Sequence, residues 1–180
     1  MNSVKVFSPA SVSNVCCGFD VLGFSIDGLG DEIIIHKSDL KGIRINNIFG
    51  HNVPLEAKEN TASVAAKSLL DYLNVDQGFD IEINKNIKPG SGIGSSAASA
   101  VGAVYGINKI LGNPLKKEQL LKFAMKGEFI SSKTAPADNV ASALYGGLIL
   151  VNNRENYNVV KLPVPKDLLA VVHHPLIEIK

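Results

Sequence analysis

A glycine-rich segment without charged residues, 89–100, has the composition of an anion-binding loop. Glycine adopts positive φ without strain and lets backbone amides approach a ligand closely. The first turn of a helix adds unpaired N–H groups and the positive end of the helix dipole. The glycines at alternate positions are Gly90, Gly92 and Gly94, and the serines that follow are Ser95 and Ser96. The segment therefore predicts a phosphate-binding loop that leads into a helix.

The spacing excludes two common nucleotide-binding loops. A Walker loop ends in Gly-Lys-Ser/Thr, whereas Gly94 is followed by Ser95. A dinucleotide fingerprint would need its third glycine at Ser95, and the preceding strand ends near Asn84, too far away for a tight turn. Because no Walker lysine is present, the phosphate charge must be neutralised by backbone amides, Mg²⁺ or other cationic groups.

The loop resembles the signature of the GHMP small-molecule kinases, which are named for galactose, homoserine, mevalonate and phosphomevalonate. A plain turn that caps a helix would not require alternate glycines, paired serines and a run of small residues. The resemblance implies that the loop holds the phosphates of ATP and that Asn60 lies near the adenine. The implied nucleotide-binding loop residues are Pro89, Gly90, Ser91, Gly92, Ile93, Gly94, Ser95, Ser96, Ala97, Ala98 and Ser99.

Two oxygen-bearing side chains are candidates for Mg²⁺, which prefers oxygen ligands. Ser96 offers a hydroxyl at the helix start, and Glu128 offers a carboxylate near the end of a later predicted helix. On local grounds alone, Glu128 is better explained as a solvated acid at a helix end. In the GHMP family, however, a glutamate followed by an Asp-Asn pair recurs, and Glu128 with Asp138 and Asn139 matches it. The resemblance therefore implies a metal site at Ser96 and Glu128.

A second group of polar residues lies near the N-terminus. Asn14 stands six residues before Asp20, whose glycine and apolar neighbours are typical of a turn that enters a buried strand. A carboxylate in such a place must be paired or reach solvent, because burying it alone is costly. The simplest local explanation is a turn aspartate that caps its own backbone.

Residues 9–23 also match the pattern P-A-[ST]-x-x-N-x-x-x-G-F-D-x-[LF]-G, which distinguishes the homoserine kinases within the GHMP family. The resemblance implies that Asn14 and Asp20 contact the amino-acid substrate. It also implies that the Asp20 carboxylate pairs with the substrate α-ammonium group.

A third group, Asp138 and Asn139, opens a predicted helix, where a plain N-cap is the simplest interpretation. In related kinases this pair lies beside the acceptor hydroxyl. The resemblance thus implies a catalytic group of Glu128, Asp138 and Asn139, with Asn139 also binding substrate. We expect Asp138 and Asn139 to orient this hydroxyl, and direct proton abstraction by Asp138 is left open. Pro136 stands where many homoserine kinases carry His, so the surroundings of the acceptor differ there.

The composition favours a protein that acts on small molecules. Lys and Arg number 18 against 17 Asp and Glu, so no electrostatic reason exists to expect nucleic acid or an anionic membrane as partner. Cys16 and Cys17 are adjacent, which is poor geometry for a disulfide and the wrong spacing for zinc, and we expect them to be reduced. No pair of the histidines has the spacing of metal ligands on one helix face. No targeting or membrane-spanning segment is recognisable, so a cytoplasmic location is expected.

Apolar patterns predict alternating strands and helices. Strict alternation over Phe79–Asn84 gives one buried and one solvated face, which favours a largely antiparallel sheet. The predicted strands are 4–8, 32–36, 43–45, 79–83, 148–151, 159–162 and 168–173. The predicted helices are one capped by Asn60 or Thr61 and ended by Asn74, one from Ser95 or Ser96 to about Leu111, one opened by Asn113 and Pro114 that runs towards Glu128, and one over about 138–145.

The GHMP resemblance implies an α+β fold of the ribosomal protein S5 domain 2-like type. This fold has a mostly antiparallel sheet, helices on one side and a left-handed βαβ unit, against the usual handedness. Residues 1–162 would form the N-terminal ATP-binding domain, and residues 163–180 would begin a C-terminal domain. The apolar terminal segment 177–180 would fray or pair with a second copy, so a homodimer is one expected assembly.

The expected activity is ATP-dependent phosphorylation of the side-chain hydroxyl of L-homoserine to O-phospho-L-homoserine in threonine biosynthesis. ATP and Mg²⁺ are the expected cofactors, and no nucleic acid or membrane partner is expected. One alternative is another GHMP kinase that acts on mevalonate-type or sugar alcohols, which Asp20 disfavours because a carboxylate suits an ammonium group. The other alternative is a nucleotide-binding module without catalysis.

Overall fold

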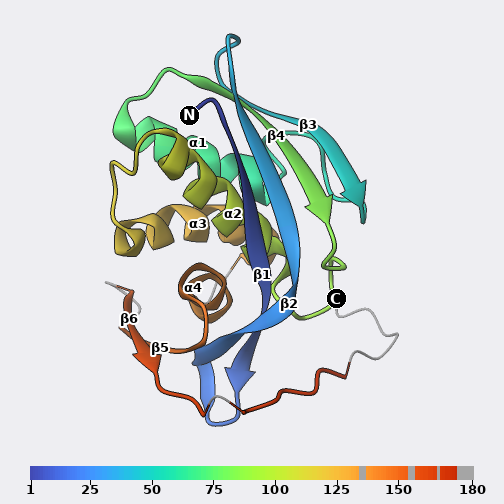
Figure 1. Ribbon diagram of the computed structural model, residues 1–180, viewed down its shortest axis with the longest axis vertical. Helices are drawn as coiled ribbons and strands as arrows, with labels where there is room; N and C mark the ends of the chain where they lie inside the picture. Colours follow the sequence, from blue (N-terminus) through green and yellow to red (C-terminus); the bar gives the residue numbers. More distant parts are fainter. Residues whose placement is uncertain (134–136, 154–156, 166, 174–180) are drawn as a thin grey trace.

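The computed structural model describes residues 1–133, 137–153, 157–165 and 167–173 of the 180-residue chain. Strands and helices alternate along it (Figure 1). The strands are β1 (Ser3–Val15), β2 (Gly18–Ser38), β3 (Ile43–Gly50), β4 (Gly78–Lys85), β5 (Leu148–Asn153) and β6 (Asn158–Leu162). The helices are α1 (Thr61–Leu73), α2 (Ser95–Ile110), α3 (Lys117–Ser132) and α4 (Ala137–Tyr145).

The strands form one six-stranded mixed sheet in the order β3-β4-β2-β5-β6, with β1 beside β2. The long strand β2 pairs antiparallel with β1, β4 and β5. Only β3 and β4 are parallel among these pairs, and α1 lies between them in the chain, so β3, α1 and β4 form a βαβ unit. The predicted α+β fold with a mostly antiparallel sheet is confirmed. The left-handed sense of the crossover stays a prediction.

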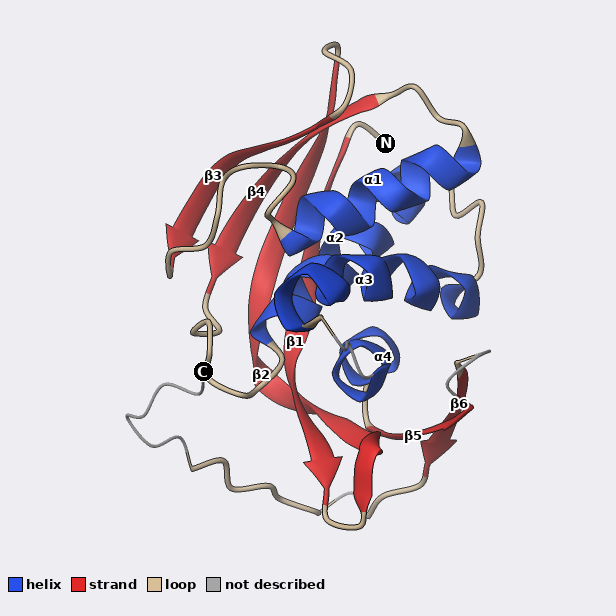
Figure 2. Cartoon of the chain, turned by 180° about the vertical axis from the view of Figure 1, so that it is seen from behind, coloured by secondary structure: helices blue, strands red, loops and turns tan. Residues whose placement is uncertain are grey.

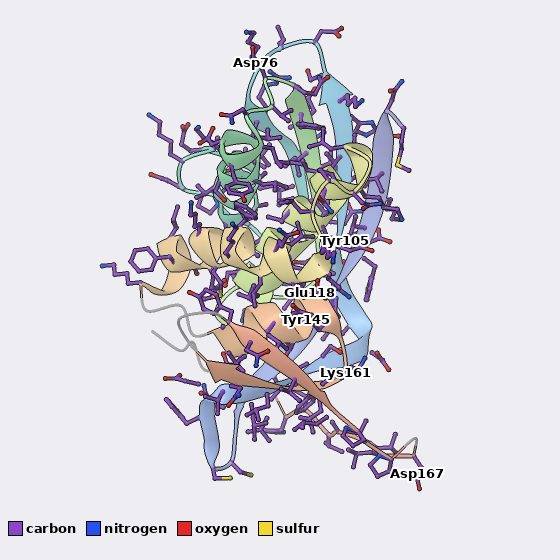
Figure 3. The ribbon with its side chains drawn as sticks, turned by 90° about the vertical axis from the view of Figure 1, so that its left-hand side faces the viewer. Asp76, Tyr105, Glu118, Tyr145, Lys161 and Asp167 are labelled. Carbon is purple, nitrogen blue, oxygen red and sulfur yellow. The ribbon has the colours of Figure 1, made fainter. Side chains whose placement is uncertain are left out.

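The helices lie together on one face of the curved sheet (Figure 2). Side chains fill the space between the two layers (Figure 3). Helix α2 packs against β1 and β2 and also contacts the other three helices. A Cβ at Gly102 would lie 2.4 Å from the Ile33 side chain, and one at Gly106 would lie 2.5 Å from that of Ile35. The small residues of α2 therefore bring its backbone directly onto β2.

Two helix boundaries illustrate how local signals work. Asn60 caps α1, because its side chain accepts a hydrogen bond from the Ala62 N–H, and Asn74 ends the helix at φ 52°. The predicted start of α3 at Asn113 and Pro114 is wrong, since the helix begins at Lys117. Asn113 has φ 59°, and its N–H donates to the carbonyl of Asn108, so it closes the preceding turn instead of opening a helix.

Two predicted strands were too short, and one predicted strand is not a strand. The strands β1 and β2 extend well beyond the predicted segments 4–8 and 32–36. The predicted strand over 168–173 is wrong, because these residues form no strand and Val171 is 96% exposed. Apolar residues alone do not make a strand, which also needs a neighbour to complete its ladder of hydrogen bonds. The segment 177–180 lies outside the described residues.

No helix in the described part of the chain is both long enough and apolar enough to cross a membrane. The two cysteines, Cys16 and Cys17, are exposed in the turn between β1 and β2.

The contact between α3 and α1 can be tested by Gly127→Ala. A Cβ at Gly127 would lie 2.3 Å from the backbone oxygen of Thr61 and 2.8 Å from the Cβ of Ala65. Alanine ordinarily favours a helix by up to ~1 kcal/mol over glycine, but separating the two helices should cost about 1–3 kcal/mol. We expect a lower free energy of unfolding in urea. Exposed Lys126→Ala is the control and should change it by less than about 0.5 kcal/mol. Equal or higher stability of Gly127→Ala would contradict the close packing.

Candidate functional site

A cavity of about 530 Å³ opens beside the start of α2. It is enclosed by the glycine-rich loop, the segment before α1, the end of α3 and the start of α4. The predicted site residues in its wall are Asn60, Pro89, Gly90, Gly92, Gly94, Ser95, Ser96, Ser99, Glu128 and Asn139. The fold thus gathers predicted nucleotide, metal and acceptor residues from four separate parts of the chain around one space.

The backbone of the loop has the conformation that its glycines suggested. Gly90, Gly92 and Gly94 have φ of 72°, 76° and 70°, a region that other residues rarely adopt. Gly94 is the N-cap of α2 and has no side chain with which to cap the first turn. The first N–H groups of α2 are therefore left available for an anion at the mouth of the helix.

Four predicted loop residues lie outside the cavity wall: Ser91, Ile93, Ala97 and Ala98. Ala97 and Ala98 are fully buried and pack into the hydrophobic core. Ile93 packs beside Ala98. The small residues that follow the serines thus serve the packing of α2 against its neighbours.

Ser96 and Glu128 are brought together from α2 and α3. The Ser96 hydroxyl donates a 2.9 Å hydrogen bond to Oε1 of Glu128. Glu128 is only 8% exposed, so the interpretation as a solvated helix-end acid is wrong. Burial raises the pKa of the Glu128 carboxyl, while the Ser96 hydrogen bond and the positive charge of Lys85 oppose that rise. A hydroxyl and a carboxylate beside a phosphate loop suit a hard cation.

Among the described residues, no three His, Cys, Asp or Glu side chains gather as a metal site. Magnesium is usually bound by one or two carboxylates together with substrate phosphates and water. The donor set of Ser96 and Glu128 therefore fits Mg²⁺ that arrives with a nucleotide.

Asn14 and Asp20 meet at the hairpin between β1 and β2. The side-chain oxygen of Asn14 accepts a 2.8 Å hydrogen bond from the Asp20 N–H, and both residues have left-handed φ, 57° and 61°. Asp138, at the start of α4, accepts a hydrogen bond from the Asn14 N–H at 3.3 Å. We call Ser11, Ser13, Asn14, Asp20, Asp138 and Asn139 the acceptor cluster.

Asp138 is fully buried within the acceptor cluster. Burial raises the pKa of its carboxyl, and the N–H groups of Asn139 and Asn14 oppose the rise by stabilising the carboxylate. The negative charge of Asp20 raises the pKa further. Two carboxylates that repel one another in this way form a region that attracts a positively charged group.

Asn139 links the acceptor cluster to the phosphate loop. Its side-chain oxygen accepts a 2.9 Å hydrogen bond from the Ser11 hydroxyl, and its side-chain nitrogen donates to the Ser13 hydroxyl at 2.9 Å. The N–H of Ser11 donates in turn to the carbonyl of Ile93 at 3.1 Å. A Cβ at Gly94 would lie 2.1 Å from the Ser11 hydroxyl. Ser11 is therefore held in direct contact with both the loop and Asn139.

Asn60 lies in the cavity wall, but both ends of its amide have backbone partners. Its oxygen accepts from the Ala62 N–H at 3.0 Å, and its nitrogen donates to the Pro54 carbonyl at 2.7 Å. In this structure it fixes the segment before α1, and its predicted place near adenine stays a prediction. The predicted departure at Pro136 falls outside the described residues.

Sequence reasoning missed Lys85 and Asp31, which form a buried ion pair at the base of the loop. Lys85 also lines the cavity. A signal was present, because the alternation that buries Phe79 and Ile83 continues to Lys85. Ile33 pairs with Ile83, and the same antiparallel register brings Asp31 opposite Lys85. Burial lowers the pKa of the Lys85 ammonium, and the Asp31 carboxylate opposes that shift.

Curated relatives carry one name consistently. The homoserine kinase of Chlorobium phaeobacteroides (strain DSM 266 / SMG 266 / 2430) is 38% identical over 193 residues, which cover all of this chain and 60% of that protein. The homoserine kinase of Xanthomonas campestris pv. campestris (strain B100) is 39% identical over 177 residues, which cover 97% of this chain and 54% of that protein. The chain spans less than two thirds of the length of these relatives.

Similar solved structures include a homoserine kinase and a mevalonate kinase. The crystal structure of homoserine kinase from Cytophaga hutchinsonii ATCC 33406 is similar at a TM-score of 0.87 and 51% identity, covering 92% of this chain and 53% of that one. The Methanococcus jannaschii mevalonate kinase has a TM-score of 0.66 at 22% identity, covering 89% of this chain and 56% of that one, and it bears on the fold alone. Residues 60–147 match the family model of the GHMP kinases N terminal domain. The chain therefore carries a GHMP kinase N-terminal domain.

Proposed function

We propose that the protein carrying this chain is a homoserine kinase. It transfers a phosphoryl group from ATP to the side-chain hydroxyl of L-homoserine in the cytoplasm, giving O-phospho-L-homoserine on the route to threonine. The observation that carries the proposal is the contact of Ser11 with both Ile93 of the phosphate loop and Asn139 of the acceptor cluster. The name shared by the curated relatives and the similar crystal structure supports the choice of substrate.

The residues around the cavity fit ATP and Mg²⁺. The backbone of Gly90, Gly92 and Gly94 and the first turn of α2 would hold the phosphates. Ser96 and Glu128 would hold the metal. When bound, ATP supplies the phosphoryl group and Mg²⁺ neutralises its negative charge. The chain's own contribution is positioning and electrostatic stabilisation, which dominate catalysis of phosphoryl transfer.

The acceptor cluster suits an amino alcohol. Asp20 and Asp138 provide the negative charge that would attract an α-ammonium group, with Asp20 making the contact. Asn139, held at both ends by Ser11 and Ser13, would orient the hydroxyl towards the phosphate loop. Asp138 accepts hydrogen bonds from backbone N–H groups, which supports a positioning role at the acceptor.

The proposal also divides the chain into two domains. Residues 1–162, which end with β6, would be the ATP-binding domain, and the residues from 163 onward would begin a second domain. The greater length of the curated relatives supports this division. The second domain would supply cationic groups for the substrate carboxylate.

Release of ADP by the intact protein tests the function. We expect steady turnover with L-homoserine, and kcat/KM lower by about tenfold or more with L-serine or mevalonate, because these place the hydroxyl or the charge differently. Turnover of mevalonate without homoserine would contradict the proposal in favour of another GHMP kinase. Tight ATP binding without turnover of any acceptor would favour a nucleotide-binding module.

The phosphate loop can be tested by Gly92→Val. A β-branched side chain resists φ of 76° and would occupy the space of the phosphates, so we expect ATP binding to be abolished in titration calorimetry. Gly112→Val is a matched control, because Gly112 has φ of 86° in the open turn after α2 and carries the same backbone strain away from the cavity. Unchanged ATP affinity in Gly92→Val would refute the loop as the phosphate site.

Substrate choice can be tested by Asp20→Asn. Asparagine tolerates the left-handed φ of this position, so the hairpin should be preserved while the charge is lost. Losing a charge-assisted contact costs about 1.5–3 kcal/mol, and the KM for homoserine should therefore rise about tenfold or more while the KM for ATP stays constant. Exposed Asp27→Asn on the same strand is the control. An unchanged homoserine KM would leave Asp20 as a turn residue only.

A further inference from the structure

A buried cation lies directly beneath the phosphate loop. The Lys85 side chain is 1% exposed and pairs with Asp31, which is fully buried. The Lys85 ammonium also donates to the carbonyl of Ser95 at 2.6 Å and to the hydroxyl of Ser99 at 2.9 Å. An ammonium group has three N–H donors. All three therefore have acceptors within the protein.

The pair ties together the two ends of the phosphate loop. Asp31 accepts 2.9 Å hydrogen bonds from the N–H groups of Asn86 and Ile87, where the chain leaves β4 for the loop. Lys85 holds the first turn of α2, where the loop ends, through its bonds to Ser95 and Ser99. The loop is thus closed at its base by one ion pair that contacts both the entering and the leaving backbone.

A contribution to the stability of the fold does not by itself explain why an ion pair is buried here. Removing two charges from water is expensive, and buried ion pairs can often be replaced by uncharged residues with little change in stability. Close to the pair, the loop must present several N–H groups to a highly charged ligand. Donors that are already fixed bind a phosphate better than donors that must first be ordered.

We propose that Lys85 and Asp31 are positioning residues of the nucleotide site, which hold the phosphate loop in its binding conformation through their hydrogen bonds to both ends of the loop. The inference rests on the proposed binding of ATP. Lys85 would then act on the backbone at the base of the loop. A Walker lysine, in contrast, contacts the phosphates directly.

The double variant Lys85→Met/Asp31→Asn tests the proposal in the intact protein. Methionine keeps the length of the side chain without its charge or donors, and asparagine keeps an oxygen for the N–H groups of Asn86 and Ile87. We expect thermal unfolding close to that of the wild type. The Kd for ATP should rise at least tenfold in calorimetry, whereas the Kd for adenosine, followed by ligand-observed NMR, should stay constant because adenosine has no phosphates.

The matched control is Lys67→Met/Asp71→Asn, which removes an exposed ion pair on α1 by the same substitutions. It should leave the Kd for ATP unchanged. Wild-type ATP affinity in the Lys85→Met/Asp31→Asn variant would overturn the proposal, and so would an equal loss of adenosine binding, which indicates general disorder of the site.

If the double variant does not fold, Ser99→Ala decides the matter, because it removes one acceptor of Lys85 from α2. We expect a Kd for ATP raised severalfold with adenosine binding intact, and an unchanged Kd would overturn the proposal. The proposed function fails separately: a wild-type protein that binds no ATP removes the nucleotide site itself, and one that binds ATP but phosphorylates no homoserine leaves the role of Lys85 standing.

Discussion

The close approach of α2 to the sheet is the constraint on which the site depends. Gly102 and Gly106 lie so near Ile33 and Ile35 that no larger side chain would fit without movement. This contact fixes where α2 begins, so it also fixes the end of the glycine-rich loop and the position of Ser96 in the first turn of the helix. Interiors are packed too densely to let such an element shift freely. The position of the loop therefore depends on apolar packing farther along the same helix.

The polar residues of the site come from distant parts of the chain and meet around that fixed helix. Ser11 and Asn139 are 128 positions apart, and Ser96 and Glu128 are 32 apart. The helical partners stand near helix ends: Ser96 in the first turn of α2, Glu128 near the end of α3 and Asn139 in the first turn of α4. Rigid elements thus bring single side chains to one place, and buried polar groups there satisfy one another's hydrogen bonds.

The sequence predicted correctly those helix ends and turns that depend only on neighbouring residues. The cap at Asn60, the end of α1 at Asn74 and the glycine loop each depend on a few neighbouring residues. Asn113 misled the sequence interpretation because asparagine suits both a helix cap and a left-handed turn, and here its N–H donates to the Asn108 carbonyl and closes the turn that ends α2. Lys85 was missed for a similar reason, since a lysine at a strand end usually reaches solvent and its buried partner comes from another strand.

Ser11 uses its backbone for Ile93 and its hydroxyl for Asn139, so one residue belongs to both halves of the site. A ligand that moved the loop would therefore disturb the contact of Ser11 with Asn139. Thermodynamic linkage then requires reciprocity: whatever nucleotide does to the affinity for the acceptor, the acceptor does to the affinity for nucleotide by the same factor. The two hydrogen bonds of Ser11 are the physical route by which such coupling would pass between the glycine-rich loop and Asn139.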